Sequence, residues 1–282
     1  RFHYDVVYMS KVFGSEYSRN IPEPMNADRV IKGGTGYAID LVNDREVYDK
    51  TRDPVMNDEI EAMCPDYSIY PNLTDDTAFG FLTRGCPRGC PFCHVAAKEG
   101  RKSCQVAELE DFWRGQRDIQ IMDPNILACK DRDHLLDDLE RSRAYVDFNQ
   151  GIDSRLITEA NMDKLAEVNI YPLRIAFDHW KLKDIYEKSI RTAVDSGIKS
   201  LSNYLLYNFE DKPEELYHRL RMNVDLCEEL GASIYSFPMK YHPINDKEFF
   251  MNRDYIGKHW NRKFIRAVQA VLNSTKGKIG RG

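Results

Sequence analysis

Three cysteines lie within eight residues of the chain, and thiols this close together in a sequence commonly bind metal. Cys86, Cys90 and Cys93 have the spacing C-x3-C-x2-C. Thiolates are the usual ligands of iron–sulfur clusters, so we expect this stretch to hold one. The neighbouring residues that favour a tight, stiff loop are Gly85, Gly89, Pro87 and Pro91.

The loop supplies three thiolates, whereas a four-iron cluster normally takes four. One iron is then left without a protein ligand, and an open position of this kind is typical of a catalytic metal. It suits a small molecule that binds through amine and carboxylate groups. The alternative is a structural zinc site with His94 or Cys104 as the fourth ligand. Zinc loops usually contain paired C-x2-C elements, and the sequence has no second pair.

The stretch Thr83–His94 resembles the signature of the radical S-adenosylmethionine (SAM) superfamily, including an aromatic residue, Phe92, just before the third cysteine. The resemblance covers roughly residues 78–240. It implies a [4Fe-4S] cluster on the three cysteines, with SAM on the open iron. It further implies that an electron cleaves SAM to methionine and a 5′-deoxyadenosyl radical, which abstracts hydrogen from an unknown substrate. An electron donor such as flavodoxin or ferredoxin and a cytoplasmic location belong to the same expectation.

The elements that must position this loop follow from the hydrophobic pattern. From Ala78 onward, apolar runs of strand length alternate with helical periodicity, which predicts a parallel sheet with right-handed crossovers. Strands are expected at 78–83, 119–122, 145–149, 173–177, 201–207 and 234–238. Helices are expected near 105–115, 132–143, 158–168, 182–196, 213–230 and 255–273. The predicted fold class is α/β, a partial parallel (βα)6 TIM-like barrel with a small N-terminal α/β appendage and a C-terminal helix.

The chain is expected to have three parts: an appendage at 1–77, the barrel at 78–243 and a helical extension at 244–282. The appendage, with strands expected at Val6–Met9 and Asp28–Lys32, resembles the end of a Rossmann-like cobalamin-binding domain that precedes some radical SAM enzymes. The resemblance rests on the glycine-rich turn Gly33–Gly36 after a strand. The cobalamin-binding pattern Asp-x-His-x-x-Gly is absent from the sequence, so we expect a truncated or degenerate domain without cobalamin.

Functional residues of such barrels lie at the C-terminal ends of the strands. Asp123 and Asn125 follow the second predicted strand, where the superfamily often binds the SAM amino group; a plain Asp-Pro-Asn turn is the alternative. Gln150, Asp153 and Arg155 follow the third strand. Their amide, carboxylate and fork-shaped cation suit a ribose and the SAM carboxylate, unless Asp153 and Arg155 form only a local pair.

Two later strand ends add candidates for cofactor binding. Asp178 or His179, after the fourth strand, could face the bound molecules, although a lone histidine is more often structural. Pro238, in the sixth strand, lies where superfamily members contact adenine through backbone groups. The segment Tyr204–Asp211 resembles the part of the family that runs beside adenine, and its aromatic residues fit core packing equally well. The sequence assigns no residue that acts on the substrate.

Composition excludes several classes of protein. The chain has 282 residues, 42% hydrophobic and 30% charged, which is a foldable mixture and excludes wholesale disorder. Its mean hydropathy is −0.57, and no apolar stretch approaches the ~18 residues of a membrane span, so we expect no membrane association. The net charge of −5 argues against a globally basic nucleic-acid coat. Since it starts at Arg1, we expect an internal piece of a longer intracellular protein.

Three further features leave alternatives open. Cys64, Cys104 and Cys129 invite a second cluster, but they lack tight spacing. After Asp254 the sequence has seven Lys or Arg residues and no acid, which could contact phosphates, for instance of RNA, or form the basic face of a surface helix. The competing functions are methyl or methylthio transfer to RNA or another macromolecule, which needs cobalamin or a second cluster, and a non-enzymatic, metal-stabilised binding module.

Overall fold

A computed structural model describes the chain over residues 2–11, 19–42, 45–52, 58–61, 63–74, 76–93, 95–241, 255–275 and 279–280. The chain divides into an N-terminal unit, Arg1–Ala62 with Pro243–Tyr255, and a larger unit, Met63–His242 with Ile256–Gly282. His94, one of the two expected fourth zinc ligands, lies outside the described residues. Within these ranges no helix combines the length and the apolar character that crossing a membrane requires.

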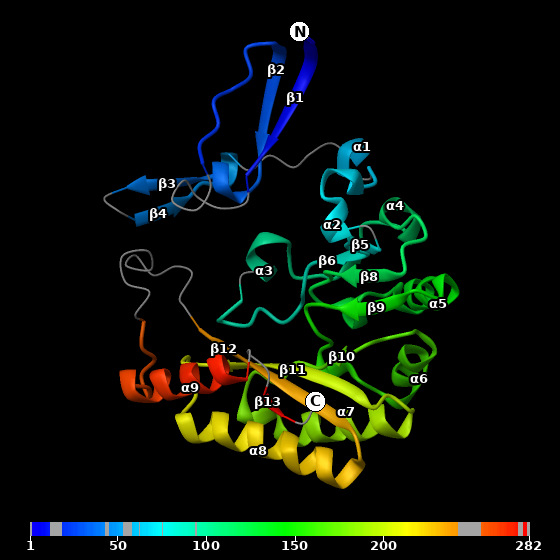
Figure 1. The fold of residues 1–282 in the computed structure, drawn as a ribbon, viewed down its shortest axis with the longest axis vertical. Helices are drawn as coiled ribbons and strands as arrows, with labels where there is room; N and C mark the ends of the chain where they lie inside the picture. The colour runs from blue at the N-terminus through cyan, green and yellow to red at the C-terminus, as the bar shows by residue number, and fades with distance from the viewer. Residues whose placement is uncertain are drawn as a thin grey trace. The chain divides into compact units, whose positions relative to one another are not determined.

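The N-terminal unit contains the two strands that the sequence predicts, β1 (Tyr4–Ser10) and β2 (Ala27–Gly33), paired in parallel (Figure 1). An antiparallel pair that the sequence does not predict follows them. Gly34, just after β2, has a φ of +91°, and a Cβ at this position would lie 2.6 Å from the carbonyl oxygen of Lys11. The glycine-rich turn thus brings the chain close to its own backbone. The other elements are η1 (Thr35–Tyr37), β3 (Ile39–Val42), β4 (Arg45–Tyr48), η2 (Lys50–Arg52) and α1 (Asp58–Glu61).

Six parallel strands follow one another in chain order through the larger unit (Figure 1). Three form one sheet and three another, and the bridges Val146–Ile170 and Ile152–Ile175 join neighbouring strands of the two sheets in parallel. The architecture is therefore α/β with parallel sheets, as the sequence predicts. The strands are β5 (Thr77–Gly80), β8 (Asp118–Ile121), β9 (Tyr145–Phe148), β10 (Leu173–Arg174), β11 (Ser200–Tyr207) and β12 (Ser233–Lys240), and β13 (Ile279–Gly280) pairs antiparallel to β12.

Helices alternate with these strands, and local capping explains several of their ends. Thr158 and Asn161 form a capping box at the start of α6, and Gly231 ends α8 in the left-handed region with a φ of +60°. The last helix begins later than predicted because the Asn261 side chain accepts a hydrogen bond from the Phe264 N–H at 2.9 Å. The helices are α4 (Leu109–Phe112), α5 (Arg132–Ser142), α6 (Glu159–Glu167), α7 (Lys183–Asp195), α8 (Pro213–Leu230) and α9 (Arg262–Ser274).

Shorter elements connect the main ones. They are η3 (Tyr67–Ile69), α2 (Pro71–Thr74), β6 (Thr83–Arg84), α3 (Val95–Lys98), β7 (Cys104–Gln105), η4 (Ile126–Ala128), η5 (Ser154–Leu156) and η6 (Trp180–Leu182). Several of them lie between a strand and the helix that follows it, at the carboxyl end of that strand. The candidate functional residues are concentrated in these connections.

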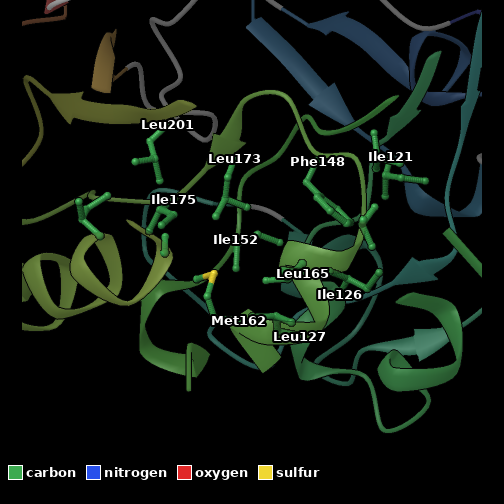
Figure 2. Packing of buried hydrophobic residues seen from close by; sticks show 14 of the residues in the cluster. Ile121, Ile126, Leu127, Phe148, Ile152, Met162, Leu165, Leu173, Ile175 and Leu201 are labelled. Atoms are coloured by element: carbon green, nitrogen blue, oxygen red, sulfur yellow. The ribbon is translucent and has the colours of Figure 1, made fainter. Parts of the chain in front are cut away.

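Alternation along the strands separates a helix-packed face from a more polar face. Ile121 of β8 and Phe148 of β9 are buried, and Figure 2 shows them within the cluster that includes Met162 and Leu165 of α6. In β8 and β9 the residues between the buried positions, Gln120 and Asp147, face the other way and are polar, whereas β12 has Tyr235 and Phe237 at such positions. Arg174 donates two hydrogen bonds to Asp147, at 2.7 and 2.8 Å. Burial of the apolar face fixes strand register and thus which residues end each strand.

Candidate functional site

The cysteine loop, residues 85–93, leaves β6 and is closed by backbone contacts. The Cys86 N–H donates to the Gly100 carbonyl at 3.1 Å, and the Cys93 N–H donates to the Cys90 carbonyl at 3.0 Å. Gly85 has a φ of +88°, and a Cβ there would lie 2.2 Å from the Lys102 carbonyl oxygen. Glycine is therefore required where the loop passes the chain that returns through β7.

The three thiols lie near one another, with Cys86 and Cys90 half-buried and Cys93 exposed. Burial raises the pKa of Cys90 and of Cys93. The negative charge of Cys93 also raises the pKa of Cys90, and the charge of Cys86 raises that of Cys93. The pKa of each of these two thiols therefore depends on the charge of another cysteine in the loop.

A zinc ion and a four-iron cube require different spacings of the sulfur atoms. Thiolates on one tetrahedral zinc, at about 2.3 Å from the metal, stand about 3.8 Å apart. The sulfur atoms of the cysteine loop do not all lie within 4.8 Å of one another; within the described ranges the set of donors that meets this limit is Glu108, His134 and Asp138. In a four-iron cube each thiolate binds a different iron, so its ligands stand further apart. Three thiolates from one loop are the usual kind of ligand set of an iron–sulfur cluster.

Asp153 links the cysteine loop to the loop after β9. Its carboxylate accepts hydrogen bonds from Arg88 Nε at 2.6 Å, from Arg155 Nε at 2.6 Å and from Asn125 Nδ2 at 3.2 Å. Burial opposes ionisation, but the bonds and charges of Arg155 and Arg88 outweigh it and lower the pKa of Asp153. The carboxylate is therefore ionised and holds two guanidinium groups beside the cysteines.

Asn125 lies against the first cysteine of the loop. Its Nδ2 is 3.6 Å from Cys86 Sγ, and its backbone carbonyl accepts a hydrogen bond from Ser103 Oγ at 2.9 Å. Its Oδ1 is buried, and no hydrogen-bond donor reaches it from the described part of the chain. Because a buried acceptor without a donor is costly, this oxygen is suited to a ligand that carries N–H groups.

Asp178 and Arg155 bring opposite charges to the thiol of Cys90. Arg155 lies within hydrogen-bonding reach of Cys90, which lowers the pKa of that thiol, whereas the charge of Asp178 raises it. Burial raises the pKa of Asp178 itself to about 6, against the opposing charges of Arg155 and Arg219. Two Arg219 N–H···O bonds, to the carbonyls of Phe177 and Asp178 at 3.1 and 3.0 Å, fix this strand end.

The structure brings most of the predicted residues together, and it gives others separate environments. Asp123 accepts hydrogen bonds from the Leu82 and Thr83 N–H groups, both at 2.8 Å, so its carboxylate supports the backbone that leads into the cysteine loop. Gln150 is exposed, and Pro238 is buried within β12. His179 Nδ1 accepts from the Lys181 N–H at 3.1 Å, which caps η6 and matches the structural alternative for this histidine.

Sequence reasoning missed two residues of this site. Arg88 lies inside the cysteine loop, but its partner Asp153 is 65 residues away, and no local pattern indicates such a pair. Arg219 lies on α8 and has no exposed surface. A lone arginine on the apolar side of an amphipathic helix was a signal that it must meet buried acceptors.

Comparisons with known proteins were made by sequence and by structure. No family model matches the chain, and no curated protein matches it. It is similar to solved structures of Streptococcus suis SuiB. The SuiB structure bound to S-adenosylmethionine has 15% identity and a TM-score of 0.44, with 71% of this chain and 48% of SuiB covered. The SuiB complex with the precursor peptide SuiA has 15% identity and a TM-score of 0.46, with 73% and 48% covered.

Coproporphyrinogen III oxidase (HemN) from Escherichia coli, a radical SAM enzyme, has 12% identity and a TM-score of 0.45, with 73% of this chain and 55% of HemN covered. The chain thus spans about half the length of these solved structures. Similarity at this level carries no argument about activity. The function proposed below rests on the cysteine loop and its surroundings.

Proposed function

We propose that the chain is a radical SAM enzyme in which Cys86, Cys90 and Cys93 hold a [4Fe-4S] cluster. The observation that carries this proposal is the loop itself. It carries three thiols near one another, and on a four-iron cube these would leave one iron without a protein ligand. Beside Cys86 the loop also has a buried amide oxygen, Asn125 Oδ1, for which the described residues supply no donor.

The chemistry that the cluster and SAM would supply is reductive cleavage of SAM to methionine and a 5′-deoxyadenosyl radical, which abstracts hydrogen from a substrate. The chain's own residues would bind SAM and orient it. Asn125 Oδ1 is the acceptor for an ammonium group, and Arg155, held in place by Asp153, is the cation for a carboxylate. Asp178 places a carboxylate near Cys90 and Cys93.

The remaining candidates take the roles that the resemblance implies or a supporting one. Pro238 is assigned to the adenine and Gln150 to the ribose, and Phe92 is a further candidate for binding the cofactor. For Asp123 we propose a supporting role, since both of its oxygens bind groups at Leu82 and Thr83. An electron donor such as flavodoxin or ferredoxin completes the proposal, and the substrate is left unassigned.

We further propose that the six parallel strands form a partial (βα)6 barrel with this site at its C-terminal end. Support comes from the origin of the side chains. The cysteines follow β5 and β6, Asn125 follows β8, Asp153 and Arg155 follow β9, and Asp178 follows β10. Convergence of successive strand ends on one site is what a parallel barrel produces.

The test is anaerobic reconstitution of the chain with iron and sulfide, followed by chemical determination of both. We expect about four irons and four sulfides per chain. Cys93→Ala should lose most of this content, whereas Cys104→Ala, an exposed cysteine outside the loop, should keep it. Zinc in place of iron, or equal loss in both variants, would refute the proposal. Iron and sulfide without release of 5′-deoxyadenosine would indicate a metal-stabilised binding module.

A further inference from the structure

An aromatic contact joins the cysteine loop to the ends of β11 and β12. The ring of Phe209, just after β11, meets the ring of Phe92 edge to face with centroids 5.8 Å apart. On its other side, Phe209 meets Tyr241, which follows β12, at 4.5 Å. Phe92 lies between Cys90 and Cys93, so whatever holds Phe209 also restrains the part of the loop that carries two of the thiols.

The chain around Phe209 is held in an uncommon conformation. Asn208 is fully buried and has a φ of +66°, in the left-handed region that asparagine adopts more readily than most other non-glycine residues. Its Nδ2 donates to the Tyr241 carbonyl at 3.2 Å. The Phe209 N–H donates to Asp211 Oδ1 at 3.0 Å. Asparagine tolerates this conformation, so the turn is held in place by the contacts around it rather than by backbone strain.

Those contacts come from a short segment far along the chain, Ile256–Trp260, here called the clasp. The Gly257 N–H donates to Asn208 Oδ1 at 2.8 Å in a buried position. A Cβ on Gly257 would lie 2.6 Å from the Asn208 carbonyl oxygen and 2.8 Å from that of Phe209, so no larger residue fits. Trp260 Nε1 donates to the Asp211 carbonyl at 3.0 Å. The clasp therefore forms hydrogen bonds with both ends of the Asn208–Asp211 turn.

We propose that the clasp is a positioning device for the cysteine loop, in which Gly257 and Trp260 fix the turn and Phe209 holds Phe92. Phe209 and Gly257 are positioning residues, because Phe209 acts through Phe92 and Gly257 acts through Asn208. The inference deepens the proposed function and rests on it for its importance to catalysis. The mechanical link between clasp and loop exists whether or not a cluster binds.

The first test deletes the ring of Phe209. In Phe209→Ala, the rate at which a small alkylating reagent modifies Cys90 in the iron-free chain should rise about threefold to tenfold, because an edge-to-face contact restrains local opening by that factor. The rate at Cys227, buried on α8, should stay unchanged. Phe264→Ala, the same deletion at an exposed position of α9, is the matched control. Mass spectrometry of digested samples gives each rate.

The second test leaves Phe209 intact and moves the turn. Gly257→Ala should raise the rate at Cys90 as well, whereas Gly197→Ala should not. A Cβ at Gly197 meets no atom within 4 Å and strains only its own backbone, with a φ of +91°. The inference is refuted if the Cys90 rate in Phe209→Ala and Gly257→Ala equals that in their controls.

Spectroscopy separates this inference from the proposed function. If the reconstituted wild-type chain holds iron and sulfide, Gly257→Ala should keep the iron but weaken the change that SAM causes in the electron paramagnetic resonance spectrum. Wild-type chain without iron would refute the proposed function, and the alkylation rates would still decide on the clasp. An unaltered spectrum together with unaltered alkylation in Gly257→Ala refutes the clasp alone.

Discussion

Asp123 is a buried carboxyl group whose ionisation opposes folding, and it supports the entry to the cysteine loop. Burial raises its pKa from an ordinary 3.8 to about 7, although Thr83 and Leu82 donate hydrogen bonds to it. The folded state therefore holds the proton more tightly than the unfolded state does. The stability that this proton contributes is complete below pH 3.8 and is lost as the pH rises through 7.

The magnitude follows from those two values. The rise in the pKa of Asp123 from 3.8 to about 7 corresponds to about 4 kcal/mol of the free energy of unfolding. Roughly 2 to 3 kcal/mol of this is lost between about pH 5 and about pH 8. Asp123→Asn removes the titration. Its amide places N–H groups against the backbone donors of Leu82 or Thr83, which costs about 1–3 kcal/mol at low pH. The amount by which the free energy of unfolding of Asp123→Asn falls below that of the wild-type chain should then shrink, or change sign, as the pH rises.

The assay is urea unfolding of the wild-type chain and of Asp123→Asn at several pH values between about 5 and about 8, followed by circular dichroism. Asp163→Asn, at an exposed position of α6, is the matched control and should differ from wild type by less than about 0.5 kcal/mol throughout. A free-energy difference between wild type and Asp123→Asn that does not change with pH would refute the reasoning.

Two further predictions concern residues that hold the site in place. Arg219→Leu removes the buried partner of the carbonyls and the carboxylate that Arg219 binds, and it should lower the free energy of unfolding in urea by roughly 3–5 kcal/mol. Arg221→Leu, the control, breaks an exposed ion pair on the same helix and should lower it by less than about 1 kcal/mol. Equal losses in the two variants would contradict the account. Asp153→Asn should retain bound iron but bind SAM about tenfold more weakly by equilibrium dialysis, because Arg155 loses its ionic partner; SAM affinity equal to that of Asp163→Asn would contradict it.

Local signals in the sequence carry much of the fold. Alternation of apolar and polar residues marks strands, so Ile119 and Ile121 on either side of Gln120 indicate β8 before any contact is known. The cap at Thr158, Pro213 in the first turn of α8 and Gly231 at its end locate two helices. These features are predictable because each depends on residues a few positions apart.

The features that the sequence does not reveal depend on contacts between distant residues. Arg88 and Asp153 are 65 positions apart, and Gly257 and Asn208 are 49 apart. Asp123 was expected to face the bound molecules because it ends a strand, but its hydrogen bonds to Leu82 and Thr83 become evident only when β5 and β8 are paired. Such pairs form only after the sheets have brought their loops together.

The antiparallel strands β3 and β4 were missed for a different reason. Half of the residues from Ile39 to Tyr48 are apolar, and the pair Asn43–Asp44 between the two runs is typical of a hairpin turn. The local signal was therefore present, but it was overlooked inside a longer polar, proline-punctuated stretch that favours the interpretation as a loop.

The central claim is that three thiols of one loop bind a cube whose fourth iron takes SAM. The most direct measurement is the electron paramagnetic resonance spectrum of the dithionite-reduced, anaerobically reconstituted chain, recorded before and after SAM is added. We predict a cluster signal that changes shape with SAM, and release of 5′-deoxyadenosine from the same sample. A signal that SAM leaves unaltered, or a chain that holds no cluster at all, would contradict the claim.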